Sequence, residues 1–108
     1  MSAELAGRLR ELVTLQRRED ARDAIGGAAG GWRAIGDYRA AIEPRPAGPQ
    51  EVADALDARP RWRVTLRAGS GARPGDRLAW RGRLIAVRAV TDDPATPERT
   101  LIEAEEER

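Results

Sequence analysis

Residues 61–67 read Arg61-Trp62-Arg63-Val64-Thr65-Leu66-Arg67, in which polar and apolar side chains alternate without a break. Successive side chains of a β-strand point to opposite faces, so this alternation predicts a strand. One face is apolar and belongs to the core. The other face carries three arginines, which repel one another unless an anion lies opposite them. That anion is expected to be a carboxylate of a neighbouring subunit or a nucleic-acid phosphate.

A second pair of strand signals follows this segment. Leu78 and Trp80 alternate with polar or small residues, and Arg81-Gly82 then leads into an apolar segment at 83–90. A two-residue turn of type I′ favours Asn or Asp before the glycine, so a longer loop with a bulge at Gly82 is an equal alternative. Both connections predict a tight antiparallel pair.

Other strand signals lie nearer the two ends of the chain. Val13 and Leu15 alternate with polar residues, and residues 32–43 form a longer segment whose alternation slips once near Gly36. A β-bulge at Gly36 would restore the register. A last strand is predicted at 101–104.

Three segments lack a strand pattern. Leucines recur at helical spacing between Ser2 and Leu12, which predicts a short N-terminal helix. The segment 26–31 is rich in glycine and predicts a mobile loop. The proline-rich segment 44–60 predicts a long connection, with one short helix or turn.

The strands together predict a mainly β fold. Five or six short strands separated by turns, without alternating helices, are typical of a small antiparallel barrel or sandwich. The length of 108 residues fits a single domain at 1–108. The expected core is made of the large apolar side chains of these strands: Trp32, Tyr38, Trp62, Val64, Leu66, Leu78, Trp80, Ile85 and Val87.

The composition excludes several kinds of chemistry. The chain has no histidine, no cysteine and no lysine, because all nineteen basic residues are arginine. Ser-His-Asp and Cys-His pairs, histidine or thiolate metal sites and Schiff-base lysines are therefore excluded. We expect no enzyme activity, no cofactor and no metal. The sequence shows neither a membrane span nor a signal peptide, so we expect a cytoplasmic chain with no membrane partner.

The net charge of +1 combines two blocks of opposite sign. Residues 59–88 contain nine arginines and one acidic residue, whereas residues 89–108 contain two arginines and seven acidic residues. In a head-to-tail contact between copies, the basic block of one copy would meet the acidic block of the next. The candidate residues of this subunit interface are Arg61, Arg63, Arg67, Glu103, Glu105 and Glu106.

A nucleic-acid binder is the alternative. In an oligonucleotide-binding barrel, Trp62 or Trp80 would stack on bases while nearby arginines hold phosphates. Those arginines would be Arg61, Arg63, Arg67, Arg81 and Arg83. The weak overall charge favours a protein partner.

Several segments, taken in order, resemble a known family. They are Leu9–Arg17, Gly31-Trp32, Tyr38–Pro44, Trp62–Arg67, Gly75–Gly82, Ile85–Val87 and Leu101–Glu105. Their combination over almost the whole chain is similar to the head-tail joining proteins of tailed bacteriophages, also called head completion or stopper proteins.

The resemblance implies a structural β-barrel protein of a phage, prophage or gene transfer agent virion, assembled in the host cytoplasm. Copies would form a homo-oligomeric ring between the portal-adaptor complex and the tail terminator or tail tube. Double-stranded DNA would pass through the ring without sequence specificity. The long connection implied to be the channel loop includes Pro44, Arg45, Pro46, Gly48, Pro49, Gln50 and Glu51.

The charge of this channel loop leaves two roles open. Acidic residues outnumber arginines in it, so the loop would either close the channel sterically and repel DNA, or dock on a neighbouring ring. A second loop is expected to become ordered against the adjacent ring, and its candidate residues are Gly26, Gly27, Gly30 and Gly31.

Overall fold

A computed structural model describes residues 9–19, 31–45, 59–92 and 94–107 of the chain. These residues form six β-strands. In chain order they are β1 (Glu11–Arg18), β2 (Trp32–Pro44), β3 (Arg61–Arg67), β4 (Arg77–Trp80), β5 (Arg83–Asp92) and β6 (Arg99–Glu106).

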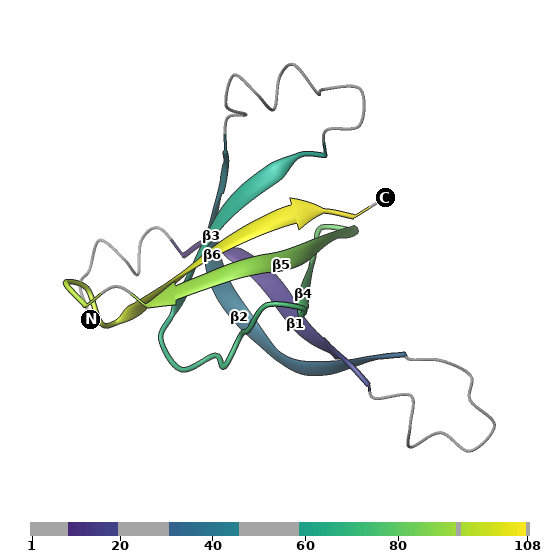
Figure 1. The fold of residues 1–108 in the computed structure, drawn as a ribbon, viewed down its shortest axis with the longest axis horizontal. Coiled ribbons are helices and arrows are strands. Elements are labelled where there is room, and N and C mark those ends of the chain that lie inside the picture. The colour runs from purple at the N-terminus through teal and green to yellow at the C-terminus, as the bar shows by residue number, and fades with distance from the viewer. Residues whose placement is uncertain (1–8, 20–30, 46–58, 93, 108) are drawn as a thin grey trace.

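The six strands close into one barrel in the order β1-β2-β3-β6-β5-β4, and every neighbouring pair is antiparallel (Figure 1). The β1–β4 pairing completes the ring of strands. Closure removes free sheet edges along the paired residues. The mainly β prediction is confirmed, and of the two predicted architectures the protein adopts the barrel.

The barrel interior holds the apolar core. Side chains from all six strands are fully or almost fully buried there: Val13, Leu15, Ala40, Val64, Leu66, Leu78, Ile85, Val87, Ile102 and Ala104. Tyr38, Trp62 and Trp80 are partly buried and pack against this cluster. Our expectation that Trp32 belongs to the core is wrong, because Trp32 is not part of this cluster. The register places Trp32 beside Arg18 at the end of β1, and its ring packs on Arg77 at 4.2 Å from the guanidinium carbon.

A bulge in β2 lies next to the predicted position. The β1–β2 register shifts after Leu15, which pairs with Gly36, and Gln16 pairs with Ala34, so Ile35 is the extra residue. A Cβ at Gly36 would lie 2.9 Å from the Tyr38 hydroxyl. A side chain at this position would therefore require the Tyr38 ring, which lies close to Gly36, to shift.

The β4–β5 connection is the two-residue turn. Trp80 pairs directly with Arg83, and both Arg81 and Gly82 have positive φ, 48° and 77°. Positive φ at both central residues defines a type I′ turn, whose twist matches that of the flanking strands. Arg81 occupies the position that Asn or Asp would favour.

The predicted helices fall mostly outside the described residues. Glu11 and Leu12, expected at the end of an N-terminal helix, are instead the first two residues of β1. Leu9 and Arg10, also part of that expected helix, are not helical. Its residues 2–8, and the possible helix after Pro49, lie in ranges that the structure does not describe. In the described ranges, no helix has the length and apolar character needed to cross a membrane.

Candidate functional site

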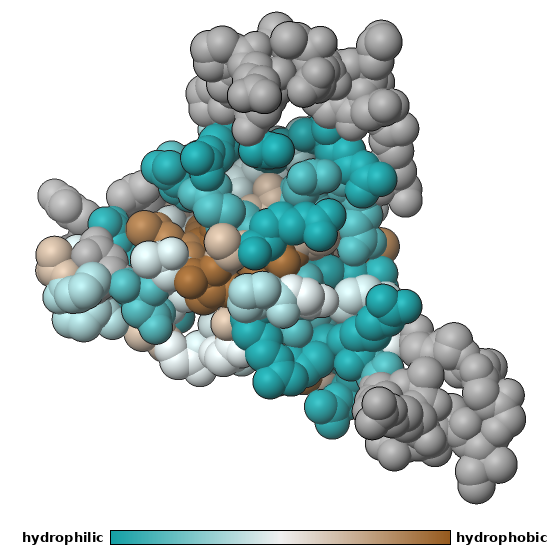
Figure 2. All heavy atoms as spheres, viewed as in Figure 1, coloured by the Kyte–Doolittle hydropathy of each residue, from teal (hydrophilic) through white to brown (hydrophobic). Residues whose placement is uncertain are grey.

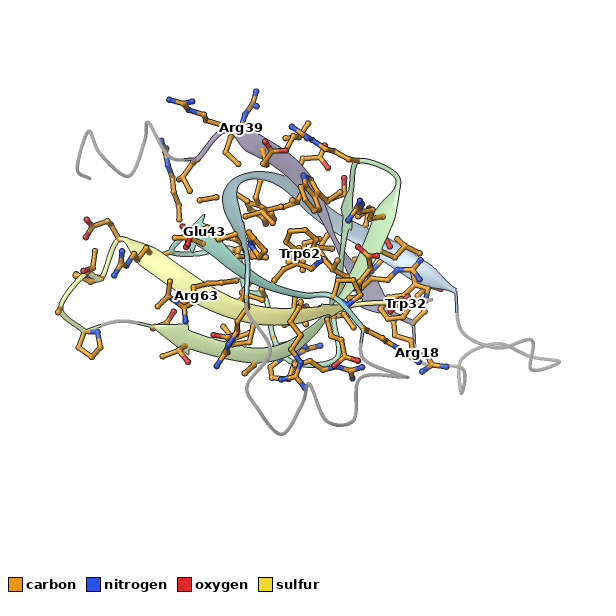
Figure 3. All side chains as sticks on the ribbon, turned by 90° about the horizontal axis from the view of Figure 1, so that it is seen from above. Arg18, Trp32, Arg39, Glu43, Trp62 and Arg63 are labelled. Atoms are coloured by element: carbon orange, nitrogen blue, oxygen red, sulfur yellow. The ribbon has the colours of Figure 1, made fainter. Side chains whose placement is uncertain are left out.

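The basic and acidic blocks of the sequence meet on one wall of the barrel. β3 pairs with β6 in a register that sets Arg61 opposite Glu105 and Arg63 opposite Glu103. Side chains at these positions face away from the core, because Trp62, Val64 and Ala104 occupy the alternate positions. Figure 3 shows Trp62 inside the barrel and Arg63 on its outer side. The arginine stripe therefore has carboxylates beside it in its own chain.

Two glutamates of β6 each contact two arginines. Glu103 forms ion pairs with Arg45 and with Arg63, whose Nε lies 3.7 Å from Oε1. Glu105 lies 4.0 Å from Nε of Arg59 and 4.0 Å from Nη2 of Arg88. We call this region the arginine surface, and it consists of Arg45, Arg59, Arg61, Arg63 and Arg88 around Glu103 and Glu105.

The arginine surface contains a shallow hollow of about 290 Å³. Its lining consists of Arg45, Arg61, Arg88, Glu103, Ala104 and Glu105. Arg63 and Arg88 expose 50% and 57% of their side chains, whereas Glu103 and Glu105 expose 34% and 24%. The guanidinium groups thus form the outer layer and the carboxylates the inner one. In Figure 2, hydrophilic side chains cover the upper ends of β3 and β6.

The other two predicted interface residues lie elsewhere. Arg67 is exposed at the far end of β3, opposite Arg99. Glu106 accepts a hydrogen bond of 3.1 Å from Nη1 of Arg83. The structure therefore brings together four of the six predicted residues, Arg61, Arg63, Glu103 and Glu105.

Two tryptophans help close one end of the barrel. The rings of Trp62 and Trp80 meet edge to face, with centroids 5.1 Å apart and planes at 75°. Trp80 Nε1 donates a hydrogen bond of 2.8 Å to Glu11, and the guanidinium carbon of Arg83 lies 5.8 Å from both ring centroids. These rings are engaged in packing, which favours arginine-mediated contacts over base stacking on this barrel.

An ion pair that sequence reasoning missed fastens the opposite end. Arg17 donates from Nε to Oδ1 of Asp76 at 3.0 Å and from Nη2 to Oδ2 at 2.9 Å. The hydrogen bond to Asp76 is the main cause that raises the pKa of Arg17. Asp76 also accepts from the backbone N–H of Arg73. One signal was available, because Asp76 is the single acidic residue among residues 59–88.

The two predicted loops are described only at their bases. Pro44 ends β2 opposite Trp62, and the backbone N–H of Arg45 donates to the carbonyl of Arg61 at 2.9 Å. Gly31 accepts a backbone hydrogen bond from Glu19 at 3.0 Å. The other residues of these two predictions lie outside the described ranges: Gly26, Gly27, Gly30, Pro46, Gly48, Pro49, Gln50 and Glu51.

The chemistry available on this wall is anion binding. Guanidinium groups form strong, charge-assisted hydrogen bonds to carboxylates and phosphates. Within the described ranges, no group of three or more Asp, Glu, His or Cys side chains gathers that could hold a metal ion.

Comparison with known proteins identifies relatives of this barrel. The sequence profile of the phage head completion protein family matches residues 5–107. One chain of the virion of a native gene transfer agent particle superposes with a TM-score of 0.68 at 23% sequence identity, covering 94% of this chain and 96% of that one. Protein SF1141 from Shigella flexneri 2a, a solution structure, superposes with a TM-score of 0.69 at 18% identity, covering 93% and 94%. A search of curated protein sequences found no significant match.

At these identities the two structures establish the shared fold, whereas the profile match covers nearly every residue. It also includes all six strands of the barrel. The resemblance seen in the sequence is thereby confirmed, and this chain belongs to the phage head completion protein family, whose members are structural proteins of the phage head.

Proposed function

We propose that this protein is a non-catalytic connector of a tailed phage or a phage-derived particle, placed between the head and the tail. Copies form a ring that binds the portal-adaptor complex on one side and the tail terminator or tail tube on the other. Double-stranded DNA passes through the ring without sequence-specific contacts. The family match over residues 5–107 carries this proposal.

The barrel wall supports assembly into a ring. A ring needs a heterologous contact, in which one surface of a copy meets a different surface of the next. The arginine surface is exposed and charged, and it includes Arg61, Arg63, Glu103 and Glu105 of the interface that the sequence predicts. We assign this wall to the contact between subunits.

The loops provide the remaining contacts in this proposal. The channel loop begins at Pro44 and Arg45, where β2 ends, and includes Pro46, Gly48, Pro49, Gln50 and Glu51. The glycine loop with Gly26, Gly27, Gly30 and Gly31 follows β1 and docks on an adjacent ring. Each loop residue whose backbone such docking fixes in one conformation would cost about 1 to 2 kcal/mol.

Deleting this chain from the particle that encodes it tests the proposal. The expected product is a population of heads without attached tails, seen in electron micrographs, and a plasmid copy of the wild-type chain should restore tails. Heads that hold their genome and attach tails normally without this chain would overturn the proposal. A separate measurement, the mass of the complex that the purified chain forms with its adaptor, would report the number of copies in a ring.

Tryptophan fluorescence distinguishes the connector from an oligonucleotide-binding barrel. Trp62 and Trp80 pack against the core, so short single-stranded DNA should leave their emission unchanged. Quenching by single-stranded DNA with a steep dependence on salt would favour the oligonucleotide binder instead.

A further inference from the structure

We propose that the turn between β5 and β6 of one copy docks on the arginine surface of the next copy in the ring. The part of this turn that makes the contact consists of Asp92, at the end of β5, and residues 94–98, and we call it the acidic turn. The inference rests on the proposed ring and names the two surfaces that would hold adjacent subunits together.

The arginine surface has fewer carboxylates than guanidinium groups. Four of its arginines share two carboxylates in pairs: Arg45 and Arg63 contact Glu103, and Arg59 and Arg88 contact Glu105. Each guanidinium group has five N–H donors and no acceptor. Both contacts with Glu105 are 4.0 Å long, which is beyond hydrogen-bonding range. A further anion could therefore accept hydrogen bonds from Arg59 and Arg88 without breaking short ones.

These guanidinium groups are open to a partner from outside. The Arg63 and Arg88 side chains are 50% and 57% exposed, and Arg88 also lines the hollow of about 290 Å³. Glu103 and Glu105 lie among the arginines, so a continuous row of DNA phosphates along this wall would meet negative charge. Separate carboxylates can instead bind single guanidinium groups. The surface thus fits a partner whose carboxylates are spaced apart.

The acidic turn has carboxylates of this kind. Asp92 is exposed, and its Oδ1 accepts a hydrogen bond of 2.9 Å from the Thr100 hydroxyl, while Glu98 is partly exposed. Among the described residues, neither of these carboxylates forms an ion pair with an arginine. The glutamates of β6, by contrast, each contact an arginine of their own chain: Glu103, Glu105 and Glu106. One part of the acidic block is thus used within the chain, and the acidic turn is left for another copy.

Backbone hydrogen bonds hold the acidic turn in shape. The N–H of Ala68 donates to the carbonyl of Glu98 at 2.9 Å, and the N–H of Arg99 donates to the carbonyl of Thr96 at 3.2 Å. Two prolines within the turn also fix their own φ angles. A preformed turn loses little conformational freedom on binding, which favours a contact made through it.

The β5–β6 hairpin keeps the two surfaces of one copy apart. Arg88 and Asp92 are four residues apart on β5, which separates their Cα atoms by about 13 Å. In Figure 1 the turn lies at the left of the barrel, whereas the ends of β2 and β3 that carry Arg45 and Arg59 lie at the top. Two different surfaces on each copy are what a heterologous contact needs, and such contacts close into rings. The receiving arginine surface therefore belongs to a second copy.

Disulfide trapping in a full-length double variant tests this contact, because the chain has no cysteine of its own. The variant carries Ala95→Cys in the acidic turn and Ala89→Cys at an exposed β5 position opposite Glu103. Ala89 lies three residues before the end of β5, about 10 Å along the strand, and a disulfide joins Cα atoms less than about 7 Å apart. We therefore expect disulfides between copies and none within one chain.

Oxidation of assembled particles should give a ladder of covalent oligomers that extends beyond the dimer, because a heterologous contact links each copy to two neighbours. A product that stops at the dimer would indicate a two-fold contact and would overturn the proposal, as would monomers alone. The matched control combines Ala95→Cys with Ala34→Cys, at an exposed alanine of β2 opposite Gln16 of β1. Its yield of linked chains should be at least tenfold lower, and equal yields would contradict the contact.

Charge variants of the double-cysteine chain probe the recognition itself. Glu98→Arg should lower the yield of linked chains at least tenfold, because like charges then face each other, and adding Arg88→Glu should restore much of it. Among the described residues neither side chain forms a hydrogen bond, so urea denaturation should show that both variants fold. Glu19→Arg makes the same charge change at an exposed position after β1 and should leave the ladder intact. An intact ladder in Glu98→Arg would overturn the proposal.

Two further readouts separate the possible failures. Binding of a short DNA duplex to the purified chain that is lost in Arg88→Glu would assign the arginine surface to DNA and overturn the proposal. Electron micrographs of the oxidised particles show whether tails are attached. Tailed particles without a ladder would overturn this contact alone. A ladder, combined with normal tails on particles from which this chain is deleted, would overturn the proposed function and leave the contact standing.

Discussion

Arg17 of β1 and Asp76, which immediately precedes β4, form a two-point ion pair with N–O distances of 3.0 and 2.9 Å. The Asp76 side chain is 3% exposed, and Arg17 Nη2 also donates to the carbonyl of Gly71 at 2.9 Å. Asp76 is tied to β5 as well, because its carbonyl accepts from the backbone N–H of Val87. The Arg17 side chain thus connects the 69–76 loop to β1, and the backbone of Asp76 connects it to β5.

We predict that Asp76→Asn destabilises the barrel by about 2 to 3 kcal/mol, because it removes the negative charge opposite Arg17 and leaves a buried amide with mismatched donors. Urea denaturation followed by tryptophan fluorescence measures the loss. Asp37→Asn is the matched control, since Asp37 is exposed and accepts a hydrogen bond of 2.7 Å from the Thr14 hydroxyl. Its effect should stay within about 0.5 kcal/mol. Equal losses in the two variants would contradict the role of the Arg17–Asp76 pair.

The pH dependence of this pair follows from the direction of the Arg17 shift. The pKa of Arg17 is raised in the folded protein by its hydrogen bond to Asp76. Its contribution to stability is therefore complete below the unfolded-state pKa and is lost only as the pH rises through the still higher folded value. The stability difference between wild type and Asp76→Asn should be the same at about pH 7 and about pH 9. A difference that shrinks over this range would show that another group controls it.

Gly82→Ala should destabilise the protein by about 1 to 2 kcal/mol, because Gly82 has a φ of 77° that side chains with a Cβ rarely adopt. Gly31→Ala is the control, since an added Cβ meets no atom within 4 Å at either position and only Gly82 has positive φ. Gly31→Ala should change the stability by less than about 0.5 kcal/mol. Thermal unfolding measures both, and equal losses would mean that the turn geometry is not the cause.

Trp62→Ala should destabilise the barrel by about 3 kcal/mol, whereas Trp32→Ala should cost about 1 kcal/mol. The reason is that Trp62 packs against the core and against Trp80, while Trp32 packs on Arg77 outside the core cluster. Urea denaturation of the two variants gives the comparison. A larger loss for Trp32→Ala would contradict this placement.

The alternation of polar and apolar residues was sufficient to predict where the strands lie. It was not sufficient to predict which residues the charged side chains contact. Alternation alone located β3 at its observed bounds, because each inward side chain of a barrel strand must be apolar. The same alternation failed at Trp32, since a large aromatic residue at the end of a strand can pack on a neighbouring arginine instead of entering the core. Periodicity reports which side chains share a face, and it does not report how deep each one lies.

The candidate site was only partly predictable for a related reason. The basic and acidic blocks are visible in the sequence, but their contact depends on the β3–β6 register, which joins residues about forty positions apart, such as Arg63 and Glu103. We therefore expected the arginines of the basic block to form ion pairs with glutamates of another copy, whereas Arg63 pairs with Glu103 of its own chain. The ion pair of Arg17 with Asp76 was missed because it joins residues far apart in the chain.

Arg83 and Glu106 offer a test of whether a predicted interface residue acts within one chain. Their ion pair of 3.1 Å is partly exposed, with 50% of the Arg83 side chain and 23% of the Glu106 side chain accessible. We predict that Arg83→Glu and Glu106→Arg each destabilise the protein, and that the double variant recovers about 0.5 kcal/mol relative to the sum of the two. High salt should reduce this coupling, because exposed charges are screened.

Protein concentration separates the two origins of this coupling. A contact inside one chain gives the same coupling free energy in dilute and in concentrated samples, since folding of a monomer does not depend on concentration. Urea denaturation at two concentrations about a hundredfold apart makes the comparison. A coupling that grows with concentration would show that Glu106 pairs with the arginine of another copy, and would return Glu106 to the subunit interface.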